Sequence, residues 1–226
     1  MNVPVRAVSW STTYRVIPTR YGEERILRKL ADAEDLDAVT AVERMTNDRR
    51  RQEDEEVSLV AARDVVKGPG SEFIMAAFTY RNREGSRFSD GSYGVYYTAK
   101  SKPTAIAETK HHREIFMSRT KEGPMRLEMC LLTAALEGDL HDVRGLQRKL
   151  AGVYHRTNYA ASRALAKDLV LEDSFGIVYD SVRHKGGECA AVFRASVLSG
   201  CKPAGLLAFD WNGTEISKVY ELREYK

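Results

Sequence analysis

The sequence has 226 residues, of which 43% are hydrophobic, 30% charged and 9% aromatic. This composition excludes a disulfide-stapled mini-protein, a collagen-like chain and a disordered chain, and it predicts a globular protein with a sizeable core. The 35 basic and 32 acidic residues give a formal charge of +3, which is too small a bias to indicate a nucleic-acid surface.

The cysteines and the N-terminus indicate the compartment. Cys130, Cys189 and Cys201 are widely spaced, with no C-x-x-C pair and no matching histidine cluster, so we expect reduced thiols and no metal site. The first ten residues lack the apolar core of a signal peptide, and no stretch approaches the roughly 18 apolar residues of a membrane span. We therefore expect a cytoplasmic protein that does not associate with a membrane.

The first third of the chain contains one predicted strand and a long polar segment. Alternating apolar residues predict a strand over 12–17, and three- and four-residue steps between apolar residues predict helix from 22 to about 47. Residues 47–56 are almost wholly charged, and because acids and bases offset each other they predict a solvated helix end or loop. The breaker at 67–70 (Lys-Gly-Pro-Gly) precedes an apolar segment at 73–80.

The middle of the chain predicts a strand that leads into a helix. Residues 93–99 have β-propensity, Ser101 suits an N-cap, and Pro103 lies in the first turn of the alanine-rich helix that follows. Two further strands are predicted, at 126–134 and at 140–143.

The last third predicts one helix and several strands. The helix covers 158 to about 171, and compact apolar strands follow at 175–179 and 189–193, separated by the polar loop 180–188. The run 206–220 contains an Asn-Gly pair between apolar flanks, which predicts a hairpin.

This arrangement predicts an α+β fold, because the strands cluster late and the helices are interspersed irregularly rather than in βαβ order. We expect a single domain over residues 1–226. Within it, 22–70 form a helical and charged insert, 71–199 form the core, and 200–226 form a C-terminal hairpin.

Several common catalytic motifs are absent from the sequence. It has no G-x-x-x-x-G-K-[ST], no G-x-G-x-x-G after a strand, no G-x-S-x-G and no H-E-x-x-H, which removes the main support for P-loop, Rossmann, α/β-hydrolase and zincin proteins. Neighbouring helical residues point about 100° apart, so His111 and His112 predict a surface pair rather than a metal site.

The helix after Ser101 carries the first candidate for chemistry. Glu108 and His112 are four residues apart and therefore share one face of the helix. From spacing alone, an ordinary surface pair is the more frequent outcome. However, the strand before this helix ends near Tyr97 and the loop before that strand contains Arg87, so an arginine, a tyrosine and a glutamate can converge on one cleft.

This order of residues resembles the RES-domain toxins, the toxin half of bacterial RES–Xre toxin–antitoxin pairs. The resemblance lies in residues 87–90 (Arg-Phe-Ser-Asp), 95–101 (Val-Tyr-Tyr-Thr-Ala-Lys-Ser) and 104–109 (Thr-Ala-Ile-Ala-Glu-Thr). An early arginine, Arg15, and a late serine, Ser181, extend it over most of the chain. Gly-Ser-Arg-Phe-Ser at 85–89 stands where the family usually has Gly-Gly-Arg-Trp-Asn.

The resemblance implies an ADP-ribosyltransferase-like mixed β core with surrounding helices, and an enzyme that uses NAD+ as its substrate without a metal. Glu108 would stabilise the positive charge that develops when the nicotinamide–ribose bond breaks. Arg87, Tyr97 and His112 would complete the catalytic group. The side chains implied to bind NAD+ are Arg15, Ser181 and, more weakly, Ser162.

The resemblance leaves the acceptor of ADP-ribose open. Transfer to water or phosphate would deplete NAD+, whereas transfer to a protein such as phosphoribosyl pyrophosphate synthetase would modify that protein. A non-enzymatic binding module on the same fold is the remaining alternative. The expected partner is an Xre-type antitoxin that blocks the active site, and we expect no direct contact with nucleic acid.

Overall fold

The computed structural model describes residues 3–19, 60–79 and 82–223. Within these residues, seven strands form one mixed sheet in the order β1-β2-β5-β4-β3-β6-β7. The strands are β1 (Val5–Pro18), β2 (Tyr96–Ala99), β3 (Met125–Asp142), β4 (Gly176–Asp180), β5 (Glu188–Val192), β6 (Leu198–Trp211) and β7 (Ile216–Leu222). The helices are α4 (Ser71–Thr79), α5 (Lys102–Ser118) and α6 (Ala160–Leu171), with 3-10 turns η2 (Ala62–Asp64) and η3 (Ala195–Val197). This is the predicted α+β class.

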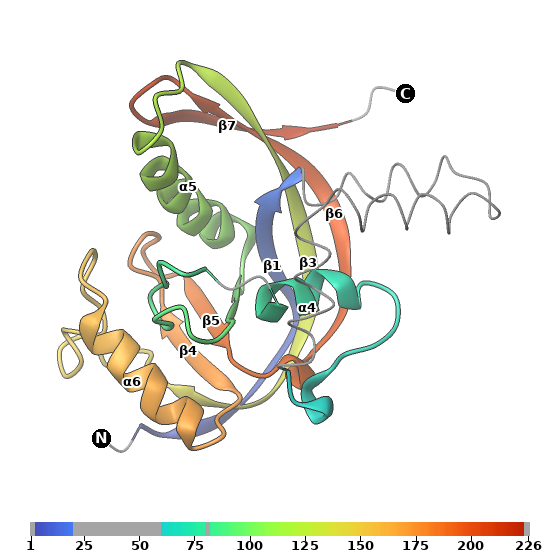
Figure 1. Ribbon diagram of the computed structural model, residues 1–226, viewed down its shortest axis with the longest axis vertical. Helices are drawn as coiled ribbons and strands as arrows, with labels where there is room; N and C mark the ends of the chain where they lie inside the picture. The colour runs from blue at the N-terminus through green and yellow to red at the C-terminus, as the bar shows by residue number, and fades with distance from the viewer. Residues whose placement is uncertain (1–2, 20–59, 80–81, 224–226) are drawn as a thin grey trace.

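The strand pairings close a ring. β1 pairs antiparallel with β3 from Val5↔His141 to Pro18↔Met129, and its other edge meets β2 at Tyr14↔Ala99. β2 continues through β5 to β4, and β4 pairs in parallel with the last residues of β3. The ring β1-β2-β5-β4-β3 is thus complete, and β6 and β7 extend from β3 (Figure 1).

Two local predictions are confirmed in detail. Ser101 is the N-cap of α5, since its hydroxyl accepts from the Thr104 amide, and a proline follows in the first turn. The hairpin between β6 and β7 turns at Asn212, whose side-chain oxygen accepts from the amides of Thr214 and Glu215 at 2.9 Å each. Both caps satisfy backbone donors that have no partner within the element itself.

The predicted strands in the first half of the sheet were too short. The strand predicted at 12–17 begins at Val5, and the two strands predicted at 126–134 and 140–143 are one continuous strand, β3. The residues between those two predictions pair with β1, including Leu136 with Trp10 and Gly138 with Val8. A partner more than one hundred residues away stabilises them, which local propensity does not register.

The remaining elements lie close to their predicted places. The predicted helix at 158–171 begins at Ala160, the strands at 175–179 and 189–193 each differ by one residue at either end, and the apolar segment at 73–80 contributes to α4. The predicted helix at 22–47 and the charged segment at 47–56 lie outside the described residues.

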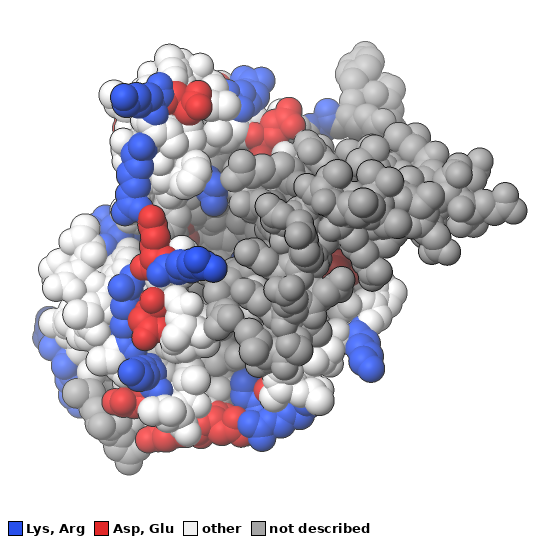
Figure 2. Space-filling view, viewed as in Figure 1, with Lys and Arg blue, Asp and Glu red and all other residues white. Residues whose placement is uncertain are grey.

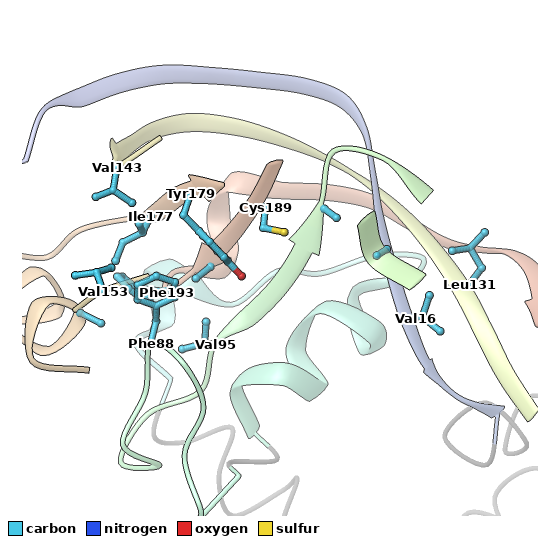
Figure 3. Packing of buried hydrophobic residues seen from close by; sticks show 14 of the residues in the cluster. Val16, Phe88, Val95, Leu131, Val143, Val153, Ile177, Tyr179, Cys189 and Phe193 are labelled. Atoms are coloured by element: carbon cyan, nitrogen blue, oxygen red, sulfur yellow. The ribbon is translucent and has the colours of Figure 1, made fainter. Parts of the chain in front are cut away.

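Two apolar clusters occupy the two faces of the sheet. One contains Phe88, Val143, Ile177, Tyr179 and Cys189, with residues of α5 and α6 packed around it. Figure 3 shows Val143, Ile177, Val153 and Phe88 of this cluster gathered beside β4. The second cluster includes four side chains of α4, namely Phe73, Ile74, Met75 and Phe78. In Figure 1, α5 and α6 both lie on the left of the view, with α6 beside β4 and α5 near β1 and β7.

The described surface carries charges of both signs, and the three cysteines are buried. Figure 2 shows basic and acidic side chains interspersed over the described part of one face. Cys130, Cys189 and Cys201 are free and buried. Among the described residues, no group of acidic, histidine or cysteine side chains is arranged to hold a metal ion, and no helix is long and apolar enough to span a membrane.

Candidate active site

Glu108 and Ser181 form the closest contact between the predicted site residues. Glu108 lies on α5, and Ser181 begins the loop between β4 and β5. The Ser181 hydroxyl donates to Oε1 of Glu108 at 2.5 Å, across 73 residues of sequence. A charge-assisted hydrogen bond of this length fixes the carboxylate against the loop. Within the described residues, no hydrogen bond engages Oε2 of Glu108.

The Ser181 hydroxyl has no capacity left for a further strong hydrogen bond. A serine hydroxyl provides one donor and two acceptor positions. Its donor is used by Glu108, and its oxygen accepts from the amides of Arg183 at 3.1 Å and His184 at 2.9 Å. Ser181 therefore holds the carboxylate in this structure, whereas the family resemblance implies that it binds NAD+.

The β4–β5 loop also contacts α5 one turn before Glu108. The Nδ1 atom of His184 is hydrogen-bonded to the Thr104 hydroxyl at 2.9 Å, and that hydroxyl is also bonded to Ser101 Oγ at 2.8 Å. Two backbone bonds close the loop itself, from Ser181 N to Gly187 O and from Gly187 N to His184 O. The loop is thus attached to α5 at two points, Thr104 and Glu108.

The helical turn after Glu108 carries two histidines with basic neighbours. His111 and His112 follow Glu108 on α5, and Arg183, Arg156 and Arg87 lie near them. Loss of hydration is the first cause that lowers the pKa of His111 to about 4, and the positive charges of the three arginines lower it further. The pKa of His112 is also lowered to about 4, first by loss of hydration and then by the charges of His111 and Arg183, although the His112 side chain is exposed. Both imidazoles are therefore neutral at pH 7.

Arg87 lies beneath this group and has a structural role in the observed arrangement. Only 6% of Arg87 is exposed. Its Nη1 donates to the carbonyls of Val153 at 2.9 Å and His155 at 3.0 Å, and its guanidinium stacks on the Tyr159 ring, 4.6 Å from the centroid. Arg87 thus ties the connection after β3 to the site, and its charge still acts on the nearby histidines.

Tyr97 and Ser162 are also held by structural hydrogen bonds. The Tyr97 hydroxyl accepts from the Phe88 amide at 2.9 Å and is bonded to Ser86 Oγ at 2.7 Å. Burial is the main cause that raises the pKa of Tyr97 to about 12, so the phenol stays protonated. Ser162 is fully buried on α6, and its hydroxyl donates to the Arg87 carbonyl at 2.6 Å. Both residues position the turn that carries Arg87.

Arg15 does not join the group. Its neighbours Tyr14 and Val16 pack in the cluster that contains Cys189 and Tyr179, so its own side chain leaves β1 on the other face. There its guanidinium stacks on the Tyr96 ring at 4.5 Å and donates to the Tyr97 carbonyl at 3.0 Å. Of the seven predicted residues, the structure brings Glu108 and Ser181 into direct contact. His112 lies one turn further along α5, and Arg87, Tyr97 and Ser162 are joined by the hydrogen bonds around residues 86–88.

Buried groups of the sheet form the floor below Glu108. Tyr179 and Cys189 are paired across β4 and β5 and point to the same side (Figure 3). Burial is the largest cause that raises the pKa of each, and the negative charge of Glu108 adds to it. The phenol and the thiol are therefore both protonated under Glu108.

Several further residues lie at the site but do not stand out in the sequence. Thr104 lies four residues before Glu108, so the same i,i+4 rule that selected His112 would have found it in the other direction. Arg183 and His184 lie two and three residues after Ser181. They could have been chosen as site residues from the expectation that this loop folds onto α5. Arg156 lies in the irregular connection after β3, where no local pattern singles it out.

The fold and the site define a single-domain α+β protein in which one carboxylate is fixed by a serine among basic side chains. The chain belongs to the RES domain family, which matches residues 62–212. The matched region contains Arg87, Tyr97, Glu108, His112, Ser162 and Ser181, and it excludes Arg15.

Two further proteins show similarity. Protein y4oC of Sinorhizobium fredii, whose name calls it uncharacterized, is 31% identical over 208 residues, which cover 92% of this chain and 86% of that protein. The crystal structure of the M. tuberculosis MbcT–MbcA toxin–antitoxin complex aligns with 88% of this chain and 86% of the matched chain, at 13% identity and a TM-score of 0.45. The family assignment rests on the family match over residues 62–212.

Proposed function

We propose that this protein is the toxin of a bacterial toxin–antitoxin pair and that it depletes NAD+ by cleaving the nicotinamide–ribose bond. The observation that carries the proposal is the Glu108 carboxylate, with Oε1 fixed by Ser181 at 2.5 Å and Oε2 not engaged by the described residues. Membership of the RES domain family supports it.

The chemistry follows from the leaving group. Nicotinamide in NAD+ is already a cationic pyridinium, so the bond between its nitrogen and C1′ of the ribose breaks with the electron pair passing to the nitrogen. Positive charge then develops on C1′ and the ring oxygen, as in glycoside hydrolysis. Glu108 would stabilise this charge and accept from a ribose hydroxyl through Oε2. An acceptor oxygen then bonds to C1′ and loses its proton.

The surrounding charges suit the rest of the substrate. The pyrophosphate of NAD+ is anionic, and guanidinium groups bind phosphate oxygens with paired donors. The charges of Arg183 and Arg156 act on His111, and their side chains are partly exposed and exposed, respectively. The neutral imidazoles of His111 and His112 would accept or donate a hydrogen bond without adding charge.

The acceptor distinguishes the two enzymatic alternatives. Water or phosphate as acceptor gives NAD+ depletion, and a protein side chain gives mono-ADP-ribosylation, for example of phosphoribosyl pyrophosphate synthetase. Both reactions would use the Glu108 carboxylate. The proposed inhibitor is an Xre-type antitoxin that covers this site. Failure of the chain to co-purify with the protein encoded beside its gene would count against that partner.

The test is release of nicotinamide from NAD+ by the purified protein. Wild type is compared with Glu108→Gln, which keeps the shape and removes the charge, and with Glu137→Gln, an exposed position on β3 outside the site. We expect release by wild type and by Glu137→Gln, and loss of at least about 100-fold in Glu108→Gln, the size typical of removing one preorganised stabilising group.

Phosphate dependence then identifies the acceptor. Acceleration by phosphate indicates phosphorolysis, and release without phosphate dependence indicates hydrolysis. Release that requires a cell extract, with label appearing on a protein, would favour the transferase. If no nicotinamide is released under any of these conditions, the proposal is overturned. A non-enzymatic binding module on the same fold is then the remaining alternative.

A further inference from the structure

The two contacts between the β4–β5 loop and α5 lie one helical turn apart. Thr104 and Glu108 occupy the same face of α5 because four residues make slightly more than one turn. His184 contacts Thr104, and Ser181 contacts Glu108. The two loop residues are themselves linked, because the His184 amide donates to the Ser181 hydroxyl at 2.9 Å. Any displacement of His184 therefore moves the group that holds the carboxylate.

We infer that Thr104 and His184 form a latch that positions Glu108 for catalysis without touching the substrate. This inference rests on the proposed function and names positioning residues for it. Thr104 is fully buried, and its hydroxyl is already bonded to Ser101 Oγ and His184 Nδ1. A buried hydroxyl with two partners has no access to NAD+, so any effect it has on the reaction passes through the loop.

The packing around Gly187 shows that the latch is closely fitted. A Cβ atom at Gly187 would lie 2.5 Å from Thr104 Oγ1, 2.7 Å from its Cγ2 and 3.0 Å from His184 Nδ1. Glycine at this position allows the loop backbone to approach the helix closely enough for the bond to form. The hydrogen bond and the close approach thus occur at the same point on α5.

The test compares Thr104→Val with Thr104→Ser. Valine keeps the shape of threonine and removes the hydroxyl, whereas serine keeps the hydroxyl and removes the methyl group. We expect kcat for nicotinamide release to fall by about 10- to 100-fold in Thr104→Val, the order expected when a reacting group is misplaced by about 1 Å. KM should stay within about twofold, because the pocket loses no substrate contact. Thr104→Ser and His184→Asn, which retain polar atoms able to form the bond, should keep most of the activity.

A matched control separates the latch from a general loss of stability. Thr13 is also fully buried, and its hydroxyl donates to the Ala134 carbonyl on the face of the sheet that Arg15 occupies, away from the cluster around α5. Thr13→Val therefore removes a comparable buried hydrogen bond and should leave kcat unchanged. Equal losses of kcat in the two valine variants, or full activity in Thr104→Val, would overturn the inference.

A second measurement tests the latch without activity. The amides of Arg183 and His184 donate to Ser181 and should exchange slowly with deuterium in the wild type. Thr104→Val should raise the exchange rate of residues 181–188 by at least about tenfold, and Thr104→Ser should not. Unchanged exchange in Thr104→Val would refute the latch even if the protein cleaves NAD+. Faster exchange in a protein that does not cleave NAD+ would support the latch and refute the proposed function alone.

Discussion

The Arg15 guanidinium donates to the backbone of Tyr97, yet the two side chains leave the sheet on opposite faces. Arg15 stacks on Tyr96, and the Tyr97 ring extends toward the turn that carries Arg87. The Arg15 guanidinium therefore links β1 to β2, and the sheet separates it from Glu108.

For Arg15→Met we predict lower stability and an unchanged affinity for substrate. The variant leaves the Tyr97 carbonyl without its side-chain donor, which costs about 1–3 kcal/mol in the free energy of unfolding. The KM for NAD+ should change by less than about twofold. Urea denaturation and steady-state kinetics measure the two effects, and a large rise in KM at unchanged stability would place Arg15 in the binding site.

Arg87→Lys should loosen the connection after β3. A lysine keeps the charge, but its single ammonium cannot reproduce the two bonds to Val153 and His155 together with the stacking on Tyr159. We expect a loss of about 1–3 kcal/mol in unfolding free energy, because buried carbonyls lose their donor. Trypsin should also cleave faster at Arg148, Lys149 and Arg156. Arg126→Lys, an exposed pair with Asp210, provides the control and should change neither property.

Histidines 111 and 112 should make the protein less stable as the pH falls. Their folded pKa values of about 4 lie below the ordinary value of 6.5. Between these values the unfolded chain binds protons that the folded chain does not bind, so unfolding becomes easier from about pH 6.5 down to about pH 4. The variant carrying His111→Gln and His112→Gln should lose stability less steeply across this range than wild type in urea denaturation. Parallel pH profiles for the two proteins would contradict the prediction.

Ser181→Ala should impair the reaction more than it impairs binding. The variant frees Oε1 of Glu108 and removes the acceptor for the amides of Arg183 and His184. We expect kcat to fall by about 10- to 1000-fold. Ser181→Thr retains the hydroxyl and should recover much of the activity. If Ser181→Ala instead raises KM with kcat unchanged, the serine binds the substrate as the sequence resemblance implied.

Much of the fold was predictable because short-range chemistry determines it. The N-cap at Ser101 and the Asn-Gly hairpin at Asn212 each depend on atoms within a few residues. The continuity of β3 was not predictable, since Leu136 and Gly138 owe their strand conformation to β1. Local patterns carry no information about a partner so distant in sequence.

The site was predictable to a similar degree. Helical spacing placed Glu108 and His112 on one face, and the family resemblance added Ser181, which lies against Glu108. Nothing in the sequence showed that Arg87 would be buried among backbone carbonyls, because its acceptors at Val153 and His155 lie in an irregular segment. Whether Arg15 faces the site depends on the register of β1 against β3, which composition does not determine.

The ring of strands has a consequence for synthesis of the chain. Thr13 of β1 finds its partner Ala134 only 121 residues later. At about 5–20 residues per second, a nascent chain carries β1 for roughly 6–24 s before that partner has been made. The edge of β1 that pairs with β3 stays open in that interval, and Ser181 emerges later still. Any enzymatic activity that depends on the contact between Ser181 and Glu108 is therefore absent until residue 181 has left the ribosome.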